Sequence, residues 1–247
     1  MTRYAVYALP GALGGGTFPE VPPSDADSRQ FEANGAREAA DAPQALRLRE
    51  AAEAWYAREE FRDLTVDARR YGFHATLKAP FRLAEGRTET ELRAAADAFA
   101  AARGPVTIAA PRPATVGHFR ALLPHGDHTG LDALAADAVR AFDDFRAAPT
   151  DEEIRRRRPE KLSPRERELF EQWGYPYVLD QFRFHLTLTD PVPDERIAEV
   201  DAALASHFAD VAGIDVPLLS IALFVEPEPG DPFHVLSVHP FAQENPV

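Results

Sequence analysis

The sequence contains no cysteine. Disulfide bonds, thiolate nucleophiles and cysteine-based zinc sites are therefore excluded. It also has no apolar run that approaches the roughly 18 residues of a membrane span. The apolar run at the N-terminus is too short and too weakly basic at its start to be a signal peptide. We therefore expect a cytoplasmic protein that does not bind a membrane.

Two common catalytic motifs are also missing. The three glycines at 14–16 are not followed by the Lys-Ser/Thr pair of a P-loop, which argues against nucleotide binding there. A serine hydrolase is not expected either, because the sequence has no Gly-x-Ser-x-Gly elbow.

Positive charge is scarce, and the formal net charge is −13. A protein this acidic should repel DNA, whereas a few cations in a cleft could still bind a small anion. The strongest basic run is 155–158, continued by Lys161, Arg165 and Arg167. A solvated helix face or loop is the expected role of this run, with a phosphate-binding arm as the alternative.

The order of predicted elements mixes strands and helices without a regular parallel repeat. This pattern indicates an α+β fold with antiparallel sheets and flanking helices. Residues 10–36 are rich in Gly, Pro, Ser and Asp and predict a long loop. Strands are expected at 3–9, 105–110, 114–123, 181–189, 214–226 and 232–238, and helices at 43–62, 87–103, 129–147, 193–209 and in part of 150–173.

A short internal repeat is the most informative feature. Residues 73–80 read FHATLKAP and residues 184–191 read FHLTLTDP, and each copy precedes a predicted helix. Such self-similarity indicates two related lobes. We expect one bilobal domain over 1–247, with lobes of about 1–125 and 126–247, two antiparallel sheets related by a pseudo-two-fold axis, and a monomer.

Strand alternation assigns a polar face to each copy. In the first copy this face carries His74, Thr76 and Lys78. In the second copy it carries Arg183, His185 and Thr187, with Thr189 beyond them. If the two faces meet, a neutral histidine can accept a proton and a protonated one can donate a proton across a bound phosphate. The threonines can bind non-bridging oxygens, and Lys78 and Arg183 can offset negative charge.

Other residues near the repeat are weaker candidates. Tyr71 and Arg82 flank the first copy, and we expect them to contact the substrate. Tyr4 and Tyr7 are more typical of core residues on a strand. The PHGDH segment at 124–128 suggests a metal cluster, but a surface turn is the preferred interpretation, so no metal site is predicted. His234 and His239 are expected to be satisfied strand histidines.

The paired His-x-Thr motifs resemble those of the two-histidine (2H) phosphoesterase superfamily. The segments RRYGFHATLKAPFRL (69–83) and DQFRFHLTLTDPV (180–192) are similar to a bacterial branch associated with phosphonate metabolism. The resemblance implies an enzyme that hydrolyses phosphoric ester bonds without a metal or cofactor. It implies that His74 and His185 form the acid/base pair and that Thr76 and Thr187 bind phosphate.

The expected activity is hydrolysis of a small cyclic phosphodiester, such as a nucleoside or sugar cyclic phosphate. A protein that binds a nucleotide or RNA end without turnover is one alternative. A 2H enzyme that processes RNA is another, although the net charge of −13 counts against a long RNA.

Overall fold

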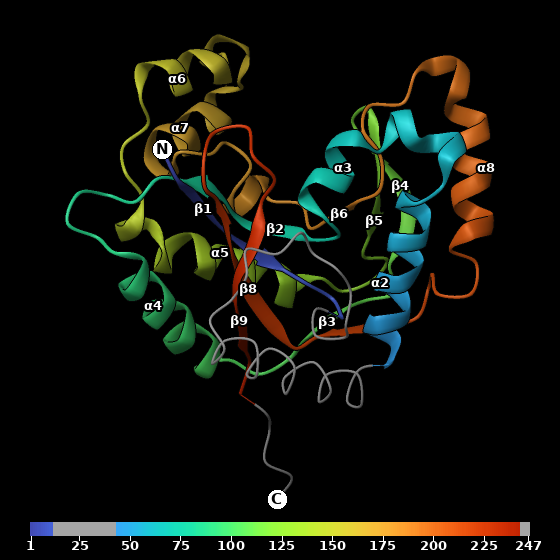
Figure 1. Cartoon of the computed structure of the whole chain (residues 1–247), viewed down its shortest axis with the longest axis horizontal. Helices are drawn as coiled ribbons and strands as arrows, with labels where there is room; N and C mark the ends of the chain where they lie inside the picture. The colour runs from blue at the N-terminus through green and yellow to red at the C-terminus, as the bar shows by residue number, and fades with distance from the viewer. Residues whose placement is uncertain (12–42, 243–247) are drawn as a thin grey trace, which may run out of the picture.

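The protein is described by a computed structural model that covers residues 1–11 and 43–242. It is a mixed α+β fold with antiparallel sheets and flanking helices, as the segment pattern predicts (Figure 1). The loop expected at 10–36 lies, apart from its first two residues, outside the described part of the chain.

The larger sheet has four strands in the order β2-β1-β8-β9, and all neighbours are antiparallel. The central strands β1 and β8 are almost fully buried, in keeping with their aromatic and β-branched content. This sheet joins strands from both sides of residue 125, where the sequence suggested a boundary between lobes. Its strands are β1 (Arg3–Ala8), β2 (Ala75–Phe81), β8 (Ser220–Glu226) and β9 (His234–Pro240).

The remaining strands of the described part form two smaller antiparallel sheets. One has the order β4-β5-β6, and the other pairs β3 with β7. Two sheets were expected, whereas the strands of the described residues form three. The pseudo-two-fold relation between the two lobes stays a prediction. The strands are β3 (Val106–Ile108), β4 (Arg112–Val116), β5 (Phe119–Leu123), β6 (Leu186–Thr187) and β7 (Val216–Leu218).

Helices flank both larger sheets (Figure 1). Helices α4 to α7 lie on the side of the four-stranded sheet, and α2, α3 and α8 lie on the side of the three-stranded sheet. Their bounds are α2 (Pro43–Tyr56), α3 (Val66–Tyr71), α4 (Glu89–Ala101), α5 (Thr129–Ala141), α6 (Asp151–Arg157), α7 (Pro164–Trp173) and α8 (Ile197–His207), with short 3₁₀ turns between several of them.

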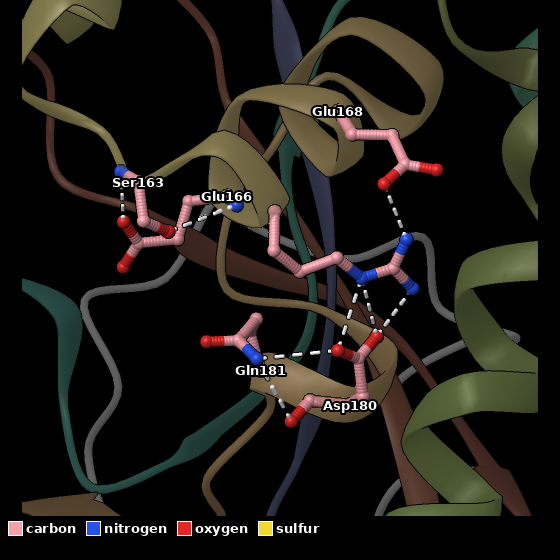
Figure 2. Close-up of polar contacts among 6 residues, drawn as sticks. Ser163, Glu166, Glu168, Asp180 and Gln181 are labelled. Atoms are coloured by element: carbon pink, nitrogen blue, oxygen red, sulfur yellow. Dashed lines mark hydrogen bonds and ion pairs between the residues drawn. The ribbon is translucent and has the colours of Figure 1, made fainter.

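Local sequence signals account for the start of several helices. Thr88 begins α4 with a capping box, in which its hydroxyl accepts from the Glu91 amide and the Glu91 carboxylate accepts from the Thr88 amide. Helix α7 begins with a capping box at Ser163 and Glu166 (Figure 2). Helix α2 ends at Tyr56, earlier than expected, and a 3₁₀ turn over Glu59–Leu64 follows.

One extended core lies between the sheets and the helices. Helix α2 contributes Ala45, Leu48, Ala52 and Trp55, spaced three or four residues apart on one buried face. The alternate face of β1 belongs to a second, aromatic cluster of Tyr7, Phe224 and Phe233. In the described residues, no helix is both long and apolar enough to cross a bilayer.

Candidate active site

The two motifs contribute to one open cleft of about 350 Å³. His74 and Thr76 from the start of β2 line it, and Thr187 from β6 lines it as well. Of the described residues, His185 is not among those that line the cleft, but it lies close enough to His74 for its charge to lower the pKa of that ring. The structure therefore brings three of the four motif side chains to one cavity and the fourth into its neighbourhood.

A hydrogen bond and aromatic contacts fix the position of the His74 ring. Its Nδ1 atom lies 3.0 Å from the Gly72 carbonyl oxygen, and its ring stacks on the Tyr7 ring at 4.0 Å between centroids. The Tyr71 and Phe224 rings lie farther out, at 6.4 Å and 6.2 Å. Burial lowers the pKa of His74 to about 4, so its ring is neutral at pH 7.

Gly72 forms the turn that leads into the first motif. It ends α3 with φ 70° and ψ −178°, a backbone conformation almost restricted to glycine. This turn directs the Gly72 carbonyl at the imidazole two residues later. The residue two positions before His74 therefore supplies the acceptor that orients the ring.

His185 repeats this arrangement in the second motif. Its Nδ1 atom lies 2.8 Å from the Arg183 carbonyl oxygen, and the Phe119 ring lies 5.6 Å from its own. Burial and the Arg183 charge lower its pKa. Like His74, it stands one residue before its strand.

These contacts set the same tautomer in both motifs. A backbone carbonyl can only accept, so Nδ1 carries the proton and Nε2 is the basic atom of the neutral ring. The exposed His128 makes the same contact to Gly126 at 3.1 Å, so the contact alone does not identify a site. What distinguishes the two motif histidines is that the contact occurs in both copies of the repeat, near one cleft.

Helix α2 holds the second motif in place. The Trp55 indole Nε1 donates to the Leu188 carbonyl at 2.9 Å, and the Tyr56 hydroxyl donates to the Thr187 carbonyl. Strand β5 pairs with β6 on the other side, with Ala121 opposite Thr187. Because β6 has only two residues, these contacts from α2 supply much of its support.

Lys78 does not face the cleft, which corrects the prediction from strand alternation. The residue is 3% exposed, and its Nζ donates to the Val139 carbonyl and the Asp143 carboxylate, both at 3.0 Å. The pairing of β1 with β2 shifts register between Thr76 and Lys78, as in a β-bulge. The extra residue reverses the alternation and turns Lys78 into the core beneath α5.

Thr189, the counterpart of Lys78 in the second motif, is also turned inward. It is 1% exposed, and its hydroxyl accepts from the Arg120 amide at 2.9 Å. The amides of Leu188 and Thr189 both donate to the Arg120 carbonyl, so the ladder is irregular at this point as well. The next residue, Asp190, lines the cleft and accepts from the amides of Asp67 and Ala68 at the start of α3.

The other predicted binding residues differ in their positions. Tyr71 and Arg82 line the cleft, and Arg82 is paired with Glu153 at 3.1 Å. Arg183 is exposed and does not line it, although its charge reaches His185.

Several cleft residues escaped the sequence reasoning. Tyr7 pairs with Thr76 across β1 and β2, so its place on the strand was the signal for its contact with the first motif. Arg3 and Arg146 also line the cleft, and no local motif marks them. Arg156 and Arg157, from the basic run, line it too, although both are exposed on a helix, as the preferred interpretation of the run predicted.

Candidates outside the cleft have ordinary structural roles. Buried His239 satisfies both ring nitrogens, with Asp97 at 2.6 Å and Ser237 at 2.8 Å. In the PHGDH turn, the Asp127 carboxylate accepts from the Thr129 amide at the start of α5. Within 1–11 and 43–242, no group of three His, Cys, Asp or Glu side chains could hold a metal ion.

Two curated proteins resemble this chain closely. Both are named ribose 1,5-bisphosphate phosphokinase PhnN. The protein from Janthinobacterium sp. (strain Marseille) is 41% identical over 174 residues, which cover 69% of this chain and 38% of that protein. The protein from Laribacter hongkongensis (strain HLHK9) is 39% identical over 175 residues, which cover 70% of this chain and 40% of that protein.

The chain therefore matches only about two fifths of the length of these relatives. Their names support the phosphonate-metabolism branch that the two motifs resemble. A family model also matches residues 76–234, a range that starts at Thr76 and includes the second motif. On this match, the chain belongs to the family described as "Protein of unknown function (DUF1045)".

Proposed function

We propose that this protein is a 2H-type phosphoesterase that opens a small cyclic phosphodiester by acid/base catalysis. The observation that carries the proposal is the convergence of both His-x-Thr motifs on one cleft, with His185 in electrostatic reach of His74. Two imidazoles supply the proton transfers of such a reaction, so no metal-bound water is required.

His74 is the general base in this proposal. Its pKa of about 4 keeps Nε2 unprotonated, and the charge on a protonated His185 disfavours a second proton on His74. Nε2 of His74 takes a proton from water as the water oxygen bonds to phosphorus. Protonated His185 donates a proton to the ester oxygen as the P–O bond breaks. The products are a phosphomonoester and a free hydroxyl, and solvent restores both protonation states.

The two threonines bind the phosphate in this scheme. Thr76 and Thr187 line the same cleft from different sheets, and each hydroxyl can donate to a non-bridging oxygen. Such bonds are worth most when they strengthen as charge develops on those oxygens.

The relatives' name includes a kinase, and we do not extend that activity to this chain. A P-loop kinase needs a Gly-Lys-Ser/Thr sequence, and neither of the two lysines here, Lys78 and Lys161, follows a glycine. The matched region is also only 38% to 40% of those proteins. We propose that the kinase activity resides in their remaining part.

The relatives' name does favour a sugar cyclic phosphate over a nucleoside cyclic phosphate as the substrate. Ribose 1,5-bisphosphate carries a phosphate on C1. Hydrolysis of a ribose 1,2-cyclic phosphate at the bond to O2 leaves a phosphate in that position. A cyclic phosphodiesterase of this type would therefore produce the kind of compound that the kinase is named for.

A panel of cyclic phosphodiesters tests the proposed function. The protein is incubated in chelator-treated buffer with ribose 1,2-cyclic phosphates and 2′,3′-cyclic nucleotides, and products are followed by ³¹P NMR. We expect at least one cyclic resonance to be replaced by that of a monoester. Tight binding without any product would favour the alternative of a binding protein, and strongly salt-dependent binding of RNA would favour RNA processing.

The pH profile of kcat/KM should have its optimum on the acid side of neutrality. Activity rises with pH as His74 loses its proton, at a pKa of about 4. It falls as His185 loses its proton, at a pKa below the ordinary 6.5. We therefore expect a bell-shaped profile with its maximum between these two values. A His125→Ala variant, altered at an exposed position, should keep the same profile, whereas a plateau extending above pH 8 would contradict the assignment.

A further inference from the structure

A second pocket of about 650 Å³ adjoins the cleft. The two cavities share several lining residues, so they lie side by side. The shared residues are Arg3, Tyr71, Arg82, Glu153, Arg156 and Arg157. Groups that bind to these shared side chains therefore lie at the border of both cavities.

The second pocket is rich in arginine. Among the described residues, five arginines and three glutamates line it, in a protein whose formal net charge is −13. Two of the glutamates are already engaged. Glu226 is fully buried against Arg3 and accepts from the Gly230 amide at 3.0 Å, and Glu153 pairs with Arg82. The remaining guanidinium groups give the pocket a local excess of positive charge.

Arg156 and Arg157 supply that excess. Both are exposed on α6, and neither forms an ion pair with a carboxylate in the described part of the chain. Arg157 lies over the Tyr175 ring, 4.8 Å from its centroid. By contrast, Arg165, from the same basic run, donates to Glu168 at 2.7 Å and to Asp180 (Figure 2). The basic run therefore contains two kinds of arginine. Carboxylates neutralise Arg165, whereas Arg156 and Arg157 remain available to bind an anion.

Helix α6 is anchored at the rim of the cavity. Thr150 begins the helix with a capping box, and its partner Glu153 also accepts from Arg82 at the end of β2. Burial alone would raise the pKa of Glu153. Hydrogen bonds from Arg82 and Thr150 outweigh this effect and lower the pKa to about 2. The carboxylate thus stays charged and ties α6 to the strand that carries the first motif.

We propose that this pocket binds a second phosphate of the substrate, through Arg156 and Arg157. The inference rests on the proposed function. It narrows the substrate to a cyclic phosphodiester of a small sugar that bears another phosphate on a distant carbon. Guanidinium groups match phosphate in charge and geometry, because they offer paired N–H donors to two oxygens. Ring opening would then yield a sugar bisphosphate.

A matched pair of substrates tests this proposal. Ribose 1,2-cyclic phosphate is compared with the same compound carrying a phosphate on O5, and the measured quantity is the ratio of their kcat/KM values. We expect the phosphorylated compound to be favoured about tenfold or more, as loss of a charged hydrogen bond usually costs at least this much. Arg156→Ala/Arg157→Ala should bring the ratio close to one. Arg155→Ala, one residue away and lining neither pocket, should leave it unchanged.

Binding of ribose 5-phosphate, measured by calorimetry, tests the pocket independently of turnover. The double variant should bind it about tenfold or more weakly than the native protein, and Arg155→Ala should bind it normally. A kcat/KM ratio near one in the native protein would overturn the proposal while the phosphoesterase activity stands. A ratio that is unchanged in the double variant would overturn it in the same way. If neither ribose compound reacts while a 2′,3′-cyclic nucleotide does, this proposal fails and the proposed function stands. If no cyclic phosphodiester reacts, the proposed function fails, and equal ribose 5-phosphate binding by native and double-variant proteins would then reject the pocket as well.

Discussion

His74→Ala is expected to lower kcat for cyclic phosphodiester hydrolysis by about 10²- to 10⁴-fold, the usual contribution of a positioned acid or base. His185→Ala should have an effect of similar size, because each imidazole performs one of the two proton transfers. Neither substitution should unfold the protein, since neither residue belongs to the fully buried core. The measurement is single-substrate turnover, together with a thermal melt for each variant.

Two controls make this result specific. His125→Ala changes an exposed histidine away from the cleft and should retain full activity. The double variant His74→Ala/His185→Ala should lose little more than either single variant, because the two groups act in one step. Full activity in either single variant would reject the acid/base assignment.

Trp55→Ala should cost about 3–5 kcal/mol of unfolding free energy, as is typical when a buried tryptophan is truncated. The Trp55 side chain is completely buried and stacks on Phe61 at 4.8 Å between centroids. Its Nε1 also satisfies the Leu188 carbonyl, next to Thr187 in the second motif. Denaturant unfolding measures the change, and a loss below about 1 kcal/mol would contradict this role for the side chain.

The second tryptophan offers a matched control for the hydrogen bond. Trp55→Phe keeps an aromatic ring but leaves the Leu188 carbonyl without its donor, which should cost about 1 kcal/mol or more. Trp173 has a buried Nε1 with no partner among the described residues, so Trp173→Phe removes no hydrogen bond. Its effect on stability should stay within about 0.5 kcal/mol. Equal losses in the two variants would show that the Leu188 contact contributes nothing.

Local sequence rules predicted the elements that frame the site. The strand at Arg3–Ala8 and the helix that begins after Thr88 followed from residue type and from the capping box. The repeat also predicted that the His-x-Thr segments occupy matching positions, and both histidines do stand one residue before a strand. These features depend on neighbours within a few residues, which is why the sequence alone reveals them.

Lys78 shows where such rules stop. Alternation holds only while a strand keeps its register, and the register shift between β1 and β2 reverses the face after Thr76. No residue in the motif marks that shift. The second copy is irregular at the same position, where Thr189 turns inward and bonds to Arg120. A polar residue two positions after each threonine therefore serves the interior and not the cleft.

The basic run shows a second limit. Its composition predicts a solvated helix face, and Arg156 and Arg157 are exposed as expected, whereas Arg165 is neutralised by Glu168 and Asp180. Unlike Arg165, Arg156 and Arg157 line the cleft, and only the position of α6 relative to β2 and β6 places them there. That placement depends on the contact between Glu153 and Arg82, which are 71 residues apart in sequence.

The central claim is that one phosphorus atom lies between the two motifs. A crystal structure of the inactive His74→Ala variant with a cyclic phosphodiester substrate tests it most directly. The account predicts the phosphate in the cleft, with non-bridging oxygens bound by the Thr76 and Thr187 hydroxyls and the ester oxygen facing Nε2 of His185. A phosphate bound away from both threonines, or a His185 ring directed away from the bound ester, would contradict it.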